Sequence, residues 1–171
     1  MIGANETAPE LRALIAGEFP PIASAREIDD LKSLLSMMGQ DASVLNDLHS
    51  WVDLVSVIGQ SPDLDSKLAF LEGASWRAFL PAWMTVCLDL RIPKARHNGL
   101  AAIAVGSIQR PPASDPARRE IFEMRVSGLT EGQRRAIRRW AVWMTSLPLF
   151  ADDPQLPARI EETWGAAVAR T

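Results

Sequence analysis

Hydrophobic residues recur at spacings of three and four along most of this chain, which is the period of an amphipathic α-helix. The first run, Leu11, Leu14 and Ile15, follows Thr7-Ala8-Pro9-Glu10, a capping box, and stops before Pro20. The same spacing predicts further helices at about 26–38, 43–58, 63–71, 76–90, 98–108, 131–146 and 155–167. Residues 117–126 suit a helix or a strand. We therefore expect an all-α protein of seven or eight helices.

Aromatic side chains concentrate in two of these segments, 76–90 and 140–147. Pro81 lies inside the first, so we expect a kink or a restart of that helix, because proline removes a helical hydrogen bond and clashes with the preceding turn. Tryptophans at helical spacing more often fill a core than line a ligand cavity. The sequence thus predicts one compact helical domain over 1–171 with a Trp-rich core and an exposed, proline-rich loop near 110–116.

Length and composition agree with a single globular domain. A chain of 171 residues that is 47% hydrophobic and 23% charged can bury a sizeable core without disulfides or metals. The one cysteine, Cys87, lies in an apolar run, which favours packing and a reducing compartment over reactivity. The longest apolar stretch, 78–88, is too short to span a bilayer, and residues 1–7 do not resemble a secretory signal. We expect a cytoplasmic protein that does not enter membranes.

Charge divides unequally between the two parts of the chain. Residues 1–75 carry 4 basic and 12 acidic side chains, whereas residues 76–171 carry 14 basic and 9 acidic ones. Arginine makes up 15 of the 18 basic residues, and its planar fork suits bidentate pairing with carboxylates. The two parts could therefore neutralise each other across the fold. Alternatively, the protein could have an acidic and a basic surface, one of which binds a charged partner.

Few residues could carry out chemistry. His49 and Asp53, four positions apart, could position a general base or bind a metal if they shared a helix face. A metal site needs three or more ligands, however, and a surface histidine beside a carboxylate explains the pair as well. His97 lies in a basic segment that fits a solvated helix N-terminus. With no phosphate-binding loop or metal-ligand motif, the sequence predicts no cofactor, no metal and no catalytic residues.

Four arginines, Arg134, Arg135, Arg138 and Arg139, form two pairs four residues apart on the side of their helix opposite Trp140. Such an arginine strip could contact phosphates, an acidic protein, or nearby glutamates such as Glu120, Glu123 and Glu131. The isoelectric point of about 5.4 makes nucleic acid the weakest of these expectations. Trp76, beside Arg77 and before Pro81, is the tryptophan we expect to be partly exposed, as an interface anchor.

Three segments resemble an uncharacterised family of small bacterial all-α domains with a leucine-proline-alanine helix. They are Leu68-Ala69-Phe70-Leu71, Trp76-Arg77-Ala78-Phe79-Leu80-Pro81-Ala82-Trp83 and Leu129-Thr130-Glu131-Gly132-Gln133, and a terminal helix bearing Trp164 also fits. The family usually carries tyrosines where this chain has Ala78 and Phe79. The resemblance implies an all-α fold over most of the chain but assigns no activity to any residue. Small acidic bacterial proteins of this kind include many immunity proteins, which neutralise secreted toxins.

We therefore expect a non-enzymatic protein that binds another protein, most concretely an immunity protein that blocks a cognate toxin. Its acidic half would supply the binding charge through six carboxylates, Glu27, Asp29, Asp30, Asp41, Asp47 and Asp53, with Trp76 and Arg77 as further contacts. The alternative is a nucleic-acid-binding regulator that uses the arginine strip. The weakest hypothesis is an enzyme that uses His49 and Asp53. An exposed Trp76 would also be compatible with a homodimer.

Overall fold

A computed structural model describes residues 6–165, and this part of the chain is all-helical. It contains eight α-helices: α1 (Ala8–Glu18), α2 (Ala25–Met37), α3 (Trp51–Gln60), α4 (Gly73–Cys87), α5 (Lys94–Ile108), α6 (Pro116–Val126), α7 (Glu131–Thr145) and α8 (Leu156–Trp164). Four short 3₁₀ segments connect them: η1 (Ala42–Leu45), η2 (Pro62–Leu64), η3 (Lys67–Phe70) and η4 (Pro148–Phe150). The predicted all-α class is therefore confirmed, and residues 117–126 are helical.

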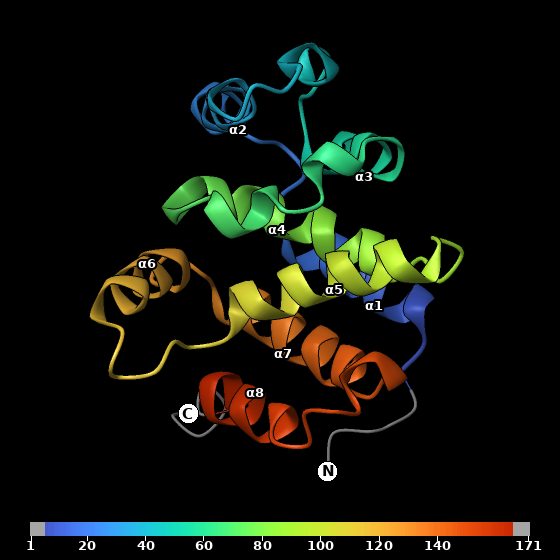
Figure 1. The fold of residues 1–171 in the computed structure, drawn as a ribbon, viewed down its shortest axis with the longest axis vertical. Coiled ribbons are helices and arrows are strands. Elements are labelled where there is room, and N and C mark those ends of the chain that lie inside the picture. Colours follow the sequence, from blue (N-terminus) through green and yellow to red (C-terminus); the bar gives the residue numbers. More distant parts are fainter. Residues whose placement is uncertain (1–5, 166–171) are drawn as a thin grey trace.

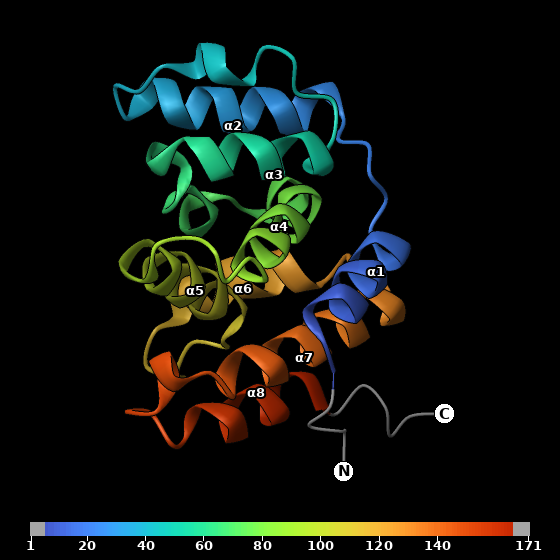
Figure 2. The same ribbon diagram turned by 90° about the vertical axis from the view of Figure 1, so that its right-hand side faces the viewer.

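The helices stack along the long axis of the molecule (Figure 1). Helices α2 and α3 lie at one end with η1, α7 and α8 lie at the other, and α4, α5 and α6 fill the middle (Figure 2). Helix α4 is the hub, since it packs against α1, α2, α3, α5 and α6. Helix α1 lies away from the end that holds α2 and α3, and it packs on α7 and α4. Buried side chains form one continuous cluster that runs from α1 to α8.

Local capping explains where several helices begin. Thr7 and Glu10 form the predicted capping box at α1, and Thr130 and Gln133, which also fit the sequence pattern of such a box, form another at α7. A third box, at α2, joins Ser24 to Glu27. These motifs satisfy backbone N–H groups that the first turn of a helix leaves without partners. Gly39 follows α2 with φ 70°, a left-handed conformation that glycine adopts readily and that is typical of the residue after a helix.

Three predicted boundaries are wrong. The helix expected over 43–58 is broken, because residues 46–50 leave the helical path between η1 and α3. There Ala23 N–H donates to His49 O, and Trp51 N–H donates to Pro21 O, so this segment pairs with the chain before α2. The helix expected over 63–71 is two 3₁₀ turns, and α5 begins at Lys94 rather than near 98. The loop expected near 110–116 is present between α5 and α6.

Helix α4 continues through Pro81 from Gly73 to Cys87, without the restart that was one of two expectations. Pro81 and most of its neighbours are buried, so tertiary packing outweighs the lost hydrogen bond. The helix ends at Cys87, so Leu90, the last residue of the predicted range 76–90, lies outside it and is exposed.

Indole groups join distant parts of the fold. Five of the six tryptophans are buried, and four donate their Nε1–H to a main-chain carbonyl of another element: Trp51 to Pro20, Trp83 to Asp65, Trp140 to Met84 and Trp164 to Ile108. Each of these four rings thus contributes apolar area while its one polar group finds an acceptor. No helix within residues 6–165 combines the length and hydropathy that crossing a bilayer requires.

Candidate functional site

The six carboxylates predicted to bind a partner all lie in the end of the molecule formed by α2, η1 and α3, which we call the acidic lobe (residues 21–62). Five of these side chains are exposed, and Glu27 is partly exposed. The lobe holds only two basic residues, Arg26 and Lys32. Among residues 6–165, none of the ion pairs includes a lobe carboxylate. The lobe therefore keeps its negative charge uncompensated.

Several of these carboxylates also begin a helix. Asp41 accepts from Ser43 N–H at the start of η1, and Asp53 accepts from the Ser50 hydroxyl at the start of α3. The hydrogen bonds from Ser43 lower the pKa of Asp41, and the bond from Ser50 is the main cause that lowers the pKa of Asp53. Both groups therefore stay ionised at neutral pH and continue to point negative charge at solvent.

Exposed apolar side chains gather in the same lobe. Ile22 and Met37 are 78% and 79% exposed, and Met38, Val44 and Val52 are also exposed. The lobe thus holds five of the eight large hydrophobic side chains that lie exposed within residues 6–165. Exposed apolar groups beside charge are typical of surfaces that bind other proteins.

The arginine strip of α7 differs from the acidic lobe, because its side chains form ion pairs and hydrogen bonds within the molecule. Arg138 pairs with Glu161 of α8 at 2.7 Å, Arg135 pairs with Glu18 of α1 at 2.7 Å, and Arg139 pairs with Glu6. Arg134 donates to the main-chain carbonyls of Val126 and Leu129. The partners are not Glu120, Glu123 or Glu131, the glutamates we had considered, because α1 and α8 are the helices that pack beside α7.

Trp76 and Arg77 do not form an exposed anchor, so that expectation is wrong. The Trp76 side chain is 0% exposed and packs beneath the guanidinium of Arg125, 5.6 Å from the ring centroid. Arg77 donates from Nη1 to the carbonyls of Met124 and Arg125 at the end of α6. Both residues therefore hold α4 against α6, and the argument for a homodimer through Trp76 no longer stands.

The candidate catalytic residues are not brought together. His49 precedes the cap of α3 and is not on a shared helix face with Asp53; only its backbone N–H reaches that carboxylate, at 3.2 Å. His97 is buried in α5, not solvated, and its Nε2 lies 2.8 Å from Cys87 O. Burial raises the pKa of the Cys87 thiol, which fits the packing role predicted for it. No group of three or more potential metal ligands occurs in residues 6–165.

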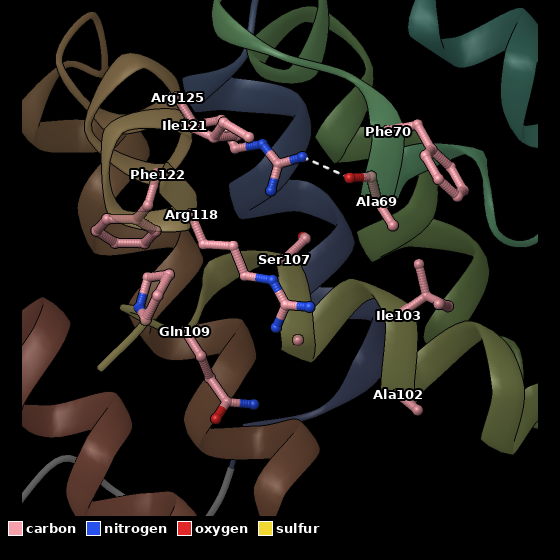
Figure 3. Close-up of a pocket in the computed structure, with 12 residues that line it drawn as sticks. Ala69, Phe70, Ala102, Ile103, Ser107, Gln109, Arg118, Ile121, Phe122 and Arg125 are labelled. Atoms are coloured by element: carbon pink, nitrogen blue, oxygen red, sulfur yellow. Dashed lines mark hydrogen bonds between the residues drawn. The ribbon is translucent and has the colours of Figure 1, made fainter. Parts of the chain in front are cut away.

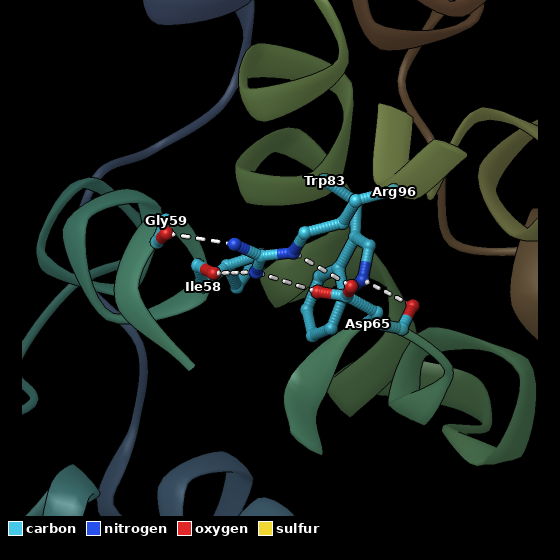
Figure 4. Close-up of polar contacts among 5 residues, drawn as sticks. All are labelled: Ile58, Gly59, Asp65, Trp83 and Arg96. Carbon is cyan, nitrogen blue, oxygen red and sulfur yellow. Dashed lines mark hydrogen bonds and ion pairs between the residues drawn. The ribbon is translucent and has the colours of Figure 1, made fainter. Parts of the chain in front are cut away.

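One ion pair positions the lobe against the rest of the molecule (Figure 4). Arg96 of α5 donates from Nε and Nη2 to the two carboxylate oxygens of Asp65, each at 2.8 Å. The same guanidinium donates to the carbonyls of Ile58 and Gly59 in the last turn of α3, which lack helical partners. The Asp65 carbonyl also accepts from the Trp83 indole at 3.2 Å. A single arginine thus connects α3, the segment after η2 and α5.

Sequence reasoning found the acidic residues but missed the apolar part of the lobe. Met38, Val44 and Val52 lie within the predicted helices 26–38 and 43–58 at a spacing that favours burial, yet all three are exposed. A signal was present, because the apolar residues over 43–58 form a stripe too wide for one helix face to bury. Arg96 had no local signal, since its partners are 31 to 38 residues away.

Comparisons of this chain with protein-family models, with curated proteins and with solved structures found no match. The resemblance to a family of small bacterial helical domains therefore stays a prediction.

Proposed function

We propose that this protein is a non-enzymatic binding module that captures a basic partner protein through the acidic lobe. The observation that carries the proposal is the contrast in charge pairing. Three arginines of the α7 strip form ion pairs with Glu6, Glu18 and Glu161. The lobe carboxylates, in contrast, form no ion pair within residues 6–165. Carboxylates outside any ion pair, in the same lobe as exposed apolar side chains, suit recognition of a complementary surface.

The concrete form of the proposal is an immunity protein that blocks a bacterial toxin. Toxins that act on nucleic acids or other phosphate-bearing substrates carry basic sites, and a cluster of carboxylates can occupy such a site in place of phosphate. Ile22 and Met37 would add apolar contacts once charge has guided the encounter. Long-range attraction would make capture fast and dependent on ionic strength.

The test co-expresses the protein with the C-terminal domain of a secreted toxin encoded beside its gene, and measures growth and the association rate. Wild type should rescue growth. The double variant Asp29→Lys/Asp47→Lys changes two exposed lobe residues and should slow association about tenfold or more at low salt. The matched control, Glu120→Lys/Asp152→Lys, changes two exposed acids outside the lobe and should behave like wild type.

Absence of a complex and of rescue would remove the immunity function. If both double variants form the complex equally well, the binding surface lies outside the acidic lobe.

The alternative, a nucleic-acid-binding regulator, would need Arg135, Arg138 and Arg139 to leave their glutamates before they could contact phosphates. No observation in the described part of the chain favours that function over protein binding. Lack of retention of the wild type on DNA or RNA at low salt would exclude it.

A further inference from the structure

A pocket of about 430 Å³ opens between η3, α5 and α6, outside the acidic lobe (Figure 3). Its walls are apolar and include Phe70, Ile103, Ile121 and Phe122. This volume lies in the range of small-molecule sites, which combine apolar walls with a few polar groups that fix orientation. The polar groups of this pocket carry one sign of charge.

Arg125 supplies the first positive charge, from the inner wall. Its residue is only 8% exposed, and its Nε and Nη2 donate to the carbonyls of Leu71 and Ala69 at 2.6 to 2.9 Å. Within residues 6–165 no ion pair includes Arg125, and Nη1 makes no hydrogen bond. Burial lowers the pKa of this guanidinium, although the charge of Glu72 opposes that effect. A buried charge that makes no direct contact with a carboxylate and is compensated by carbonyl dipoles, the Trp76 ring and the longer-range charge of Glu72 favours a nearby anion.

Arg118 supplies the second positive charge, from the rim. It precedes Arg125 by seven residues on α6, so both side chains leave the same face of that helix. Its Nε lies 3.4 Å from Asp115 Oδ2, and its terminal nitrogens point into the pocket in Figure 3. The Arg125 guanidinium is drawn above it on the same side, and the Gln109 amide lies at the lower rim. No aspartate or glutamate is among the described residues that line the pocket.

The geometry points to a binding site for a small amphipathic carboxylate, a molecule with one carboxylate and one aromatic or branched apolar group. The carboxylate would lie between Arg118 and Arg125, where two guanidinium groups can donate charge-assisted hydrogen bonds. The apolar group would pack against Phe70 and Ile103 across the pocket. Phe70 is 55% exposed, so a ligand seated there would also cover apolar surface that now faces water.

The experiment titrates the full-length protein with 2-naphthoate by isothermal titration calorimetry and compares the uncharged analogue 2-naphthalenemethanol. Wild type should bind naphthoate with a dissociation constant below about 1 mM, as its size allows. The alcohol should bind about tenfold more weakly, because it has no charge to place between the arginines. Because both compounds share the naphthalene ring, the difference between their affinities measures the contribution of the carboxylate.

Two variants separate the pocket from the rest of the surface. Arg118→Gln should weaken naphthoate binding about tenfold. The matched control Arg119→Gln removes an adjacent, partly exposed charge that does not line this pocket and should change the affinity less than about twofold. Gly106→Leu should abolish binding by filling the pocket. The variant should fold, because a Cβ at Gly106 meets no atom within 4 Å.

The proposal fails if wild type does not bind naphthoate, if the alcohol binds equally well, or if Arg118→Gln and Arg119→Gln bind alike. Because these measurements do not involve the acidic lobe, they stand or fall separately from capture of a basic protein.

Discussion

Replacement of Arg96 by methionine should destabilise the protein by about 2–3 kcal/mol, because it removes four hydrogen bonds at once. Two go to the Asp65 carboxylate and two to the carbonyls of Ile58 and Gly59. Bonds to a charged donor contribute about 1.5–3 kcal/mol each when buried, but the Arg96 and Asp65 side chains are 20% and 22% exposed. Water can therefore replace part of the lost hydrogen bonding, so the expected destabilisation is smaller than the sum of four buried bonds.

Urea unfolding followed by tryptophan fluorescence measures this free energy. The matched control is Arg91→Met, since Arg91 also makes a bidentate pair, with Asp89, at the same 2.8 Å distances. That pair is local and the Arg91 side chain is 89% exposed, so its loss should cost less than about 0.5 kcal/mol. Equal destabilisation by the two substitutions would refute the argument that bridging three segments gives Arg96 its importance.

A double-mutant cycle with Asp65→Asn tests the pairing itself. We expect a coupling free energy of about 1–2 kcal/mol between Arg96 and Asp65. Amide exchange in the last turn of α3 should accelerate in Arg96→Met, because the carbonyls of Ile58 and Gly59 lose their donor. A coupling near zero, with unchanged exchange, would mean that packing alone holds the lobe in place.

Three further predictions concern the capping, packing and charge of single residues. Ser24→Ala should destabilise the protein by about 1 kcal/mol in urea unfolding, whereas Ser36→Ala, at an exposed site inside α2, should change stability by less than about 0.5 kcal/mol. Cys87 should react with a disulfide reagent only as fast as the fold opens, and rapid reaction of the native protein would contradict its burial. The hydrogen bond from Arg91 lowers the pKa of Asp89 from 3.8 to about 2. The small stabilisation that this solvent-exposed pair supplies is therefore present above about pH 4 and is lost as the pH falls toward 2. Asp89→Asn should therefore flatten the loss of unfolding free energy over that interval, and an unchanged slope would contradict the pairing.

The division of charge links the fold to the proposed function. The chain's acidic excess lies mainly before residue 76, yet two of those acids, Glu6 and Glu18, serve the arginines of α7. The acids of the lobe form no ion pair with the helix that packs on them. Helix α4, the neighbour of α2 and α3, directs its one arginine, Arg77, to carbonyls of α6 and meets Asp30 through the Ser75 hydroxyl. The internal neutralisation and the charged pole that the sequence left as alternatives therefore coexist in different parts of the molecule.

The sequence by itself determined features that depend on neighbouring residues. Capping boxes at Thr7 and Thr130 act over three residues, so their helix starts could be predicted from local chemistry. The all-α class follows from hydrophobic spacing, and the burial of Cys87 follows from the apolar run around it.

Only the tertiary structure decided which helix covers which surface. Trp76 is buried because α6 lays Arg125 over it, and Met37 is exposed because no element covers the end of α2. The break at 46–50 depends on pairing with residues 21–23, and Arg138 finds its glutamate 23 residues away on α8. Such contacts join residues far apart in the chain, and local spacing carries no information about which of the many complementary partners will be brought within reach.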